Sequence, residues 1–228
     1  MGGERFNAGM LQAELIPARE AGAKDLLVVL HGLGDSMEGY RWVPQMLGRP
    51  GLNILLVNAP GEYYGGFAWY DLPPDFEPGV KLPAGGEAGV GVERSYGLLE
   101  KLLDEWRGKG YPTERTVMFG FSQGCLMSVE TAVRYPHRLA GIIGVSGYVY
   151  EPERLLRMAS PVAKEQRFLI THGMDDPLIP FAESRKQFEQ LKTAGMQIDF
   201  HAYRKVHTII EPEFELFRKF LGERLGGK

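Results

Sequence analysis

The chain has 228 residues, a net charge of −3 and a pI near 6.0, so its charge gives no reason to expect nucleic acid as a partner. This length is enough for one sizeable α/β domain, and the single cysteine excludes an intramolecular disulfide and fits a reducing compartment. The N-terminus lacks a signal-peptide pattern, and no apolar run is long enough to span a bilayer. We therefore expect a soluble cytoplasmic protein without stable membrane insertion, either a monomer or a homodimer.

Apolar runs typical of buried strands alternate with helical patterns along the whole chain. Strands are expected at 10–16, 25–31, 52–57, 116–121, 140–145, 167–171 and 197–203, and helices at 92–106, 123–135, 181–194 and in the C-terminal segment. Such alternation predicts an α/β fold with a mostly parallel central sheet and helices on both faces. No linker suggests a second unit, so residues 1–228 are expected to form one domain. Ligands of such sheets bind beyond the carboxyl ends of the strands.

A G-x-S-x-G motif, Gly120 to Gly124, lies between an expected strand and an expected helix. In this context Ser122 occupies a sharp strand-to-helix turn that exposes its hydroxyl, and the two glycines permit close approach of neighbouring backbone. The helix that follows directs free N–H groups toward whatever the serine attacks. The motif therefore indicates a nucleophilic serine. A second serine, Ser146, also precedes a glycine, but it lacks this spacing and is expected to be structural.

The segment His31-Gly32-Leu33-Gly34-Asp35 directly follows a continuous apolar run. Two glycines so soon after a buried strand indicate a loop whose backbone N–H groups can face a ligand. An oxyanion hole requires this arrangement, with donors in place before the charge develops. A plain glycine turn is the alternative interpretation of this pentapeptide.

Residues 60–90 are rich in glycine and proline but also carry many aromatic side chains. A loop of this length within a compact domain is uncommon and is usually functional. The aromatic side chains could form a small satellite core, or they could line an apolar pocket. We expect the loop to be a lid or the wall of an acyl pocket, and its candidate substrate-binding residues are Phe67, Trp69, Tyr70 and Phe76.

An acid and a base follow the serine in the chain. Asp175 and Asp176 lie after an expected strand and before Pro177, where a carboxylate could be held rigidly to accept a hydrogen bond from an imidazole. His207 follows the last expected strand, and only His201 and His207 come after the acidic pair. His201 lies within the alternating pattern of that strand, so His207 is the better candidate for the base.

The order serine, aspartate, histidine is that of the α/β-hydrolases. More narrowly, the chain resembles the phospholipase/carboxylesterase family, which includes the acyl-protein thioesterases. The matching pieces span nearly the whole chain in the family's order: His31 to Asp35, Trp69-Tyr70-Asp71, Gly120 to Gly124, His172-Gly173 with Asp176-Pro177, and His207. Two features depart from the family pattern, namely Cys125, where a second glycine is common, and the long loop up to Gly91.

The resemblance implies the α/β-hydrolase fold and a catalytic triad of Ser122, Asp176 and His207, with Asp176 preferred because it directly precedes the proline. It also implies that the backbone N–H groups of Leu33 and Gln123 form the oxyanion hole. The reaction it implies needs neither a metal nor a cofactor. The substrate would be a small acyl ester or thioester. We expect short to medium acyl chains, because the loop from Gly61 to Gly91 lacks the bulk needed to enclose a long one.

Several alternatives remain open at the level of sequence. The chain could instead act on long acyl chains, as an acyl-protein thioesterase or a lysophospholipase. A dienelactone-hydrolase-like or peptidase-like enzyme could share the same fold, although a serine nucleophile disfavours the former. A non-catalytic binding module is the third alternative, and an intact triad disfavours it because a pure binder has no need of all three groups.

Overall fold

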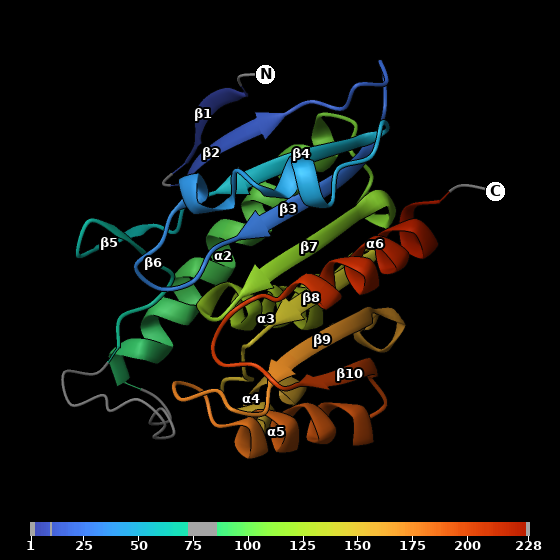
Figure 1. The fold of residues 1–228 in the computed structure, drawn as a ribbon. Coiled ribbons are helices and arrows are strands. Elements are labelled where there is room, and N and C mark those ends of the chain that lie inside the picture. The colour runs from blue at the N-terminus through green and yellow to red at the C-terminus, as the bar shows by residue number, and fades with distance from the viewer. Residues whose placement is uncertain (1–2, 10, 73–85, 227–228) are drawn as a thin grey trace.

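The computed structural model describes residues 3–9, 11–72 and 86–226. Its central feature is an eight-stranded sheet with the order β1-β2-β4-β3-β7-β8-β9-β10 (Figure 1). The strands are β1 (Glu4–Ala8), β2 (Leu11–Ile16), β3 (Asp25–Leu30), β4 (Leu52–Val57), β7 (Thr116–Phe121), β8 (Gly141–Val145), β9 (Arg167–Gly173) and β10 (Gln197–Tyr203). The β1–β2 and β2–β4 pairs are antiparallel, whereas the pairs from β4 to β10 are parallel. The predicted mostly parallel sheet is confirmed.

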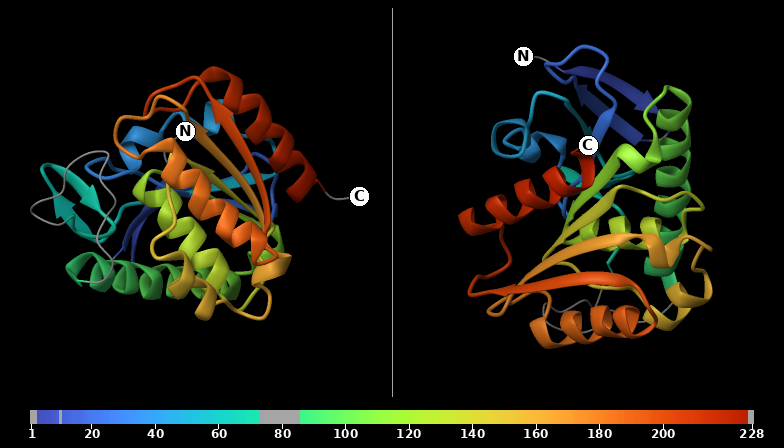
Figure 2. Two further views of the ribbon diagram at one scale, coloured as in Figure 1. Left: turned by 90° about the horizontal axis from the view of Figure 1, so that it is seen from below. Right: turned by 90° about the vertical axis from the view of Figure 1, so that its right-hand side faces the viewer.

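Helices cover both faces of this sheet, as predicted (Figure 2). One face packs against α2 (Gly86–Gly108), α3 (Gln123–Arg134), α4 (Pro152–Arg157) and α5 (Phe181–Thr193). The other packs against the short η1 (Met37–Tyr40) and α1 (Val43–Met46), and against α6 (Glu211–Leu225). The remaining short turns are η2 (Thr113–Arg115) and η3 (Ala163–Glu165). The central strands β3 and β4 are buried at every position, which explains their continuous apolar sequences.

Between β3 and β7 the chain stops adding strands on one side of the sheet and begins to add them on the other. From β3 the sheet extends through β4 on one side and through β7 on the other, so β3 and β7 border the switch point of the topology. The loops that follow these two strands carry Leu33 and Ser122. Open α/β sheets bind ligands at this position, beyond the carboxyl ends of the strands. The topology therefore brings the two sequence motifs together.

The segment expected to be a loop from 60 to 90 contains regular structure on both sides of residues 73–85, which lie outside the described residues. Strands β5 (Gly61–Tyr63) and β6 (Gly66–Ala68) form a hairpin, and helix α2 begins at Gly86, six residues earlier than expected. Gly91 lies within this helix, and a Cβ there would lie 2.7 Å from the Cβ of Tyr70. This glycine therefore reflects close packing, and the prediction that the loop extends through it is wrong.

Candidate active site

Ser122 lies between β7 and α3 in a conformation that side chains rarely adopt, with φ 54° and ψ −116°. Glycines on both sides allow this turn to form. A Cβ at Gly120 would lie 2.1 Å from the carbonyl oxygen of Gly124, and one at Gly124 would lie 2.2 Å from that of Leu30. The serine amide donates to Val145 O at 2.9 Å, which ties the turn to the neighbouring strand. The predicted strand–serine–helix turn is present, and it places Ser122 in the wall of a cavity at the carboxyl end of β7.

His207 and Asp176 are joined by a hydrogen bond. Nδ1 of His207 donates to Oδ2 of Asp176 at 2.8 Å, so in the neutral ring Nε2 carries no proton. The other carboxylate oxygen, Oδ1, accepts from the amides of Leu178 and Ile179 at 2.9 and 3.0 Å. Burial alone would raise the pKa of Asp176, but the hydrogen bonds from His207 and from these amides outweigh it and hold the pKa below its usual range.

The structure also distinguishes the two candidate acids. Asp176 is buried and bonded to His207, whereas the side chain of Asp175 is exposed. Its backbone amide donates to Lys205 O at 3.2 Å, which joins the loop after β9 to the loop after β10. Of the pair, only Asp176 has its carboxylate in contact with His207. The other histidine considered, His201, pairs with Asp199 on β10 at 2.9 Å and does not line the cavity.

Leu33 and Gln123 lie beside the serine as expected for oxyanion donors. Both line the cavity that contains Ser122, and a Cβ on the neighbouring Gly32 would lie 3.3 Å from Cβ of Ser122. Within the described part of the chain, neither backbone N–H donates a hydrogen bond to another group. Gln123 is the first residue of α3, so its amide belongs to the free N-terminal set of that helix.

The side chain of Gln123 has a role that the sequence did not reveal. Its Oε1 accepts from the amide of Trp69 at 3.0 Å, and its Nε2 donates to Tyr70 O at 2.9 Å. Trp69 is fully buried and its Nε1 donates to His31 O at 2.9 Å. The residue after Ser122 therefore holds the segment from β6 to Tyr70 against the loop of the predicted oxyanion hole. Because these partners lie more than 50 positions apart, the sequence carries no local signal of the contact.

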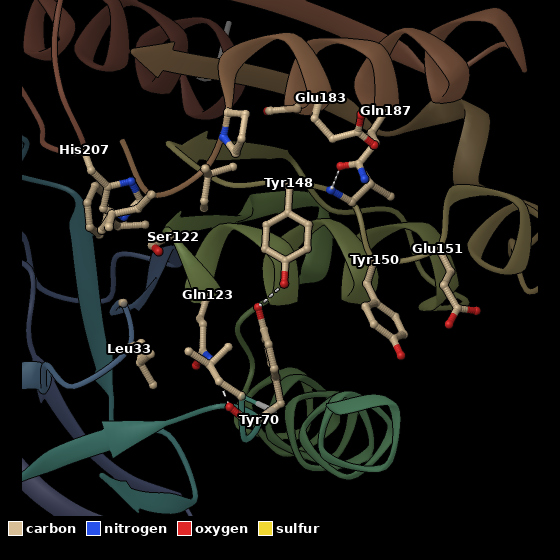
Figure 3. Close-up of a pocket in the computed structure, with 18 of the residues that line it drawn as sticks. Leu33, Tyr70, Ser122, Gln123, Tyr148, Tyr150, Glu151, Glu183, Gln187 and His207 are labelled. Carbon is tan, nitrogen blue, oxygen red and sulfur yellow. Dashed lines mark hydrogen bonds between the residues drawn. The ribbon is translucent and has the colours of Figure 1, made fainter. Parts of the chain in front are cut away.

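A cavity of about 310 Å³ contains Ser122 and His207 (Figure 3). Its apolar wall includes Tyr70, Leu72, Tyr148, Leu178 and Ile179. The hydroxyl oxygens of Tyr70 and Tyr148 lie 2.8 Å apart and join the two sides of this wall. In Figure 3 Glu151, Glu183 and Gln187 lie on the side away from Ser122 and His207, so that side of the cavity is polar.

The four expected substrate-binding residues are placed differently from one another. Tyr70 lines the cavity. Among the described residues, Phe67 and Trp69 do not: Trp69 is buried beneath the site, and Phe67 pairs its backbone with Asp35. Phe76 lies outside the described residues, as does the segment expected to act as a lid. Phe67 and Trp69 therefore form the base of the site, as in the satellite-core alternative. Of the three described aromatic residues, Tyr70 is the one that lines the cavity.

Two further buried groups hold the loops that carry Asp176 and His207, and the sequence assigned a role to neither. Nε2 of His172 donates to Ile179 O at 3.0 Å and lies 3.4 Å from Oδ2 of Asp176. Burial lowers the pKa of His172, so the ring is neutral there. Lys205, two residues before His207, donates to Oε1 of Glu213 at 2.5 Å, and both side chains are almost fully buried.

The strand order and the strained serine at the switch point define an α/β-hydrolase. The chain matches the model of the phospholipase/carboxylesterase family over residues 11–224 and belongs to that family. It is 33% identical to acyl-protein thioesterase 1 of Schizosaccharomyces pombe over 68% of this chain and 69% of the relative. It is 28% identical to acyl-protein thioesterase 1 of Candida albicans over 90% and 94% of the two chains.

The fold has a close counterpart among solved structures. The crystal structure of esterase PE8 superposes with a TM-score of 0.82 at 28% identity, over 94% of this chain and 99% of that one. Together these similarities make the protein a hydrolase that acts on carboxylic esters. Within the described residues, no helix is both long and apolar enough to cross a membrane.

Proposed function

We propose that the protein is a serine esterase that hydrolyses short to medium acyl esters through Ser122, His207 and Asp176. The observation that carries this proposal is the strained Ser122 facing the same cavity as His207, whose Nδ1 donates to Asp176 at 2.8 Å. That bond supports the tautomer in which Nε2 takes the serine proton as Oγ attacks the acyl carbonyl. The Leu33 and Gln123 amides are the proposed donors to the oxyanion. Water then attacks the acyl-enzyme, with His207 again acting as base.

The size of the cavity supports the preference for short to medium chains. A volume of about 310 Å³ lies at the lower end of the range for small-molecule sites, and its far side carries Glu183 and Gln187. An apolar chain that reached these polar groups would strip water from them without replacing their hydrogen bonds. Each methylene buried before that point contributes about 0.8 kcal/mol. We expect kcat/KM to rise with acyl length until the apolar part of the cavity is full, and then to fall.

A thioesterase acting on acylated protein is the second candidate, and it is favoured by the similarity to acyl-protein thioesterase 1 of S. pombe. Both candidates share the acyl-enzyme and differ in the leaving group. Two measurements test them. A fluorophosphonate probe should label the wild-type protein and not Ser122→Ala, and a protein that resists labelling would contradict the proposed nucleophile. Matched oxygen esters and thioesters of increasing acyl length then compare the leaving atom and locate the length optimum.

A further inference from the structure

A second depression lies beside the catalytic cavity, on the face of the sheet covered by η1 and α6. It is a groove of about 430 Å³ that contains a set of mainly apolar side chains. Its lining residues are Asp35, Gly39, Tyr40, Trp42, Met46, Phe121, Thr208, Ile209 and Phe214. Two of them, Trp42 and Phe214, pack against each other with ring centroids 5.3 Å apart at 66°, and both are half-buried. Half-buried aromatic rings leave apolar area in contact with water, which a ligand can cover.

This groove adjoins the catalytic cavity. Asp35 and Phe121 line both spaces, and Phe121 directly precedes Ser122. The ring of Phe121 lies 4.9 Å from that of His207, centroid to centroid. Thr208 and Ile209, which line the groove, directly follow His207 in the chain. The proposed base therefore stands at the boundary, with the cavity on one side and the groove on the other.

We propose that the groove binds the leaving group of the substrate while the cavity binds the acyl chain. This inference rests on the proposed function. In acylation, His207 passes the serine proton to the departing oxygen or sulfur, so that atom must lie next to the imidazole. The acyl group stays bonded to Ser122 through the second step, which suits the cavity beneath Tyr70 and Tyr148. The leaving group must depart first, which suits a groove whose rim includes the exposed Asp35, Gly39 and Thr208.

The lining also defines the chemical class of the leaving group. Six of the nine lining residues are aromatic or aliphatic, and Asp35 is the only charged residue among the nine. Asp35 places a carboxylate at the boundary, with one oxygen accepting from the amide of Ser36 at 2.7 Å. An anionic leaving group would meet this charge, whereas a neutral apolar one would cover the rings of Trp42 and Phe214. The groove therefore fits a neutral alcohol or thiol that carries an aromatic or branched aliphatic group.

The test keeps the acyl group constant and varies the alcohol. Methyl, butyl and benzyl butanoates have alcohols of similar acidity, so differences in kcat/KM report contacts made by the leaving group. For the wild type, benzyl should exceed methyl butanoate by roughly tenfold or more, which corresponds to burial of one aromatic ring. Trp42→Ala and Phe214→Ala should remove most of this benzyl-to-methyl ratio. Phe220→Ala is the matched control, since Phe220 is half-buried on the same helix as Phe214 but does not line the groove.

Thr208→Trp tests the groove without removing any core contact, because Thr208 is exposed. It should obstruct the groove and lower kcat/KM for benzyl butanoate more than for the methyl ester. The deacylation rate contains no leaving group, so its dependence on acyl length should be the same in all groove variants. If the variants change that dependence, the groove holds the acyl chain and the assignment is overturned. An unchanged benzyl-to-methyl ratio with intact fluorophosphonate labelling overturns the groove alone, whereas loss of labelling in the wild type overturns the proposed function with it.

Discussion

At the scale of single residues, burial distinguishes two neighbouring carboxylates that have the same chemistry in the sequence. Asp175 and Asp176 are neighbours with the same carboxylate, yet only Asp176 is buried and bonded to the His207 imidazole. The two backbone amides on its other oxygen fix its orientation. A carboxylate in this position can hold the ring in one tautomer and stabilise the imidazolium that forms during attack. An exposed carboxylate can do neither.

Asp176→Asn should lower kcat by about 10⁴-fold, because an amide stabilises the wrong imidazole tautomer and not the imidazolium. Asp175→Asn, the matched control, should change kcat by less than about threefold, since its side chain faces water. Steady-state hydrolysis of a butanoate ester measures both. The reverse ranking of the two variants would show that the acid has been misassigned.

Cys125 should be chemically inert in the folded enzyme. It is fully buried on α3, and Cβ atoms placed on Gly144 and Gly147 would lie 2.6 and 2.4 Å from its sulfur. Burial raises the pKa of its thiol to about 12, so the reactive thiolate is scarce near neutral pH. Iodoacetamide at pH 8 should leave ester turnover unchanged and modify Cys125 only after denaturation. Rapid inactivation that substrate prevents would contradict this.

At the scale of elements, the loop that carries His207 is held by a buried ion pair. Lys205 and Glu213 are 1% and 0% exposed at their side chains, and Oε2 of Glu213 also accepts from the amide of Ile210 at 2.8 Å. One carboxylate therefore caps α6 and binds the loop after β10. Burial lowers the pKa of Lys205 even though Glu213 acts in the opposite direction. Desolvation is thus the larger effect on this lysine.

Each single substitution in this pair should destabilise the protein in a way that the double substitution partly reverses. Glu213→Gln leaves the buried Lys205 charge without its ion-pair partner, and Lys205→Met does the same to Glu213. Each should lower the free energy of unfolding by about 3–5 kcal/mol. The double variant should recover more than half of the summed loss, since the glutamine can still accept from Ile210. Urea denaturation of the four proteins measures this coupling, and additive losses would show that the two charges act independently.

The elements differ in how far sequence could define them. Residues 52–57, 116–121 and 197–203 were predicted with the observed bounds, because each is a compact run between turn residues. Several described elements were not predicted, among them the β5–β6 hairpin, β1 and α4. β1 has polar residues at Glu4, Arg5 and Asn7, and only its pairing with β2 makes it a strand. α4 has six residues, too few for a helical period to show, and it begins after Glu151 in the left-handed region.

Some residues of the site could be located from the sequence and others could not. Ser122, Asp176 and His207 each follow a strand, so motif order and strand-end position could locate them. The side chains of Gln123, His172 and Lys205 act through partners that are set by tertiary packing, and no local pattern marks them. Phe67 and Trp69 were expected to contact substrate, but they do not line the cavity. Their aromatic character suggested a pocket wall, but composition cannot distinguish the two sides of a loop, and the fold turns Trp69 inward.

At the scale of the whole molecule, the packing of α3 on β3 and β7 couples the core to the site. Gly124 lies on the first turn of α3, directly over the end of β3. A Cβ there would lie 2.2 Å from Leu30 O and 2.7 Å from His31 O. These carbonyls belong to the strand and loop that lead to Leu33. Any displacement of the helix would therefore separate the two proposed oxyanion donors, one on each element.

Two identical substitutions at different helical glycines test this coupling. Gly124→Ala must push α3 away from β3, because backbone carbonyls cannot yield as a flexible side chain would. We expect it to lower the free energy of unfolding by about 1–3 kcal/mol, as overpacking does. It should also lower kcat by about 10²-fold or more, the typical effect of losing one oxyanion donor.

Gly97→Ala is the matched control, since Gly97 lies within α2 and a Cβ there would meet nothing within 4 Å. It should raise the free energy of unfolding by about 0.5–1 kcal/mol through helix propensity and leave kcat unchanged. Urea denaturation and ester hydrolysis measure both variants. Should Gly124→Ala lose stability but keep full kcat, the oxyanion donors would have to lie elsewhere than on α3 and the loop after β3, because displacement of this helix could not then affect the reacting carbonyl.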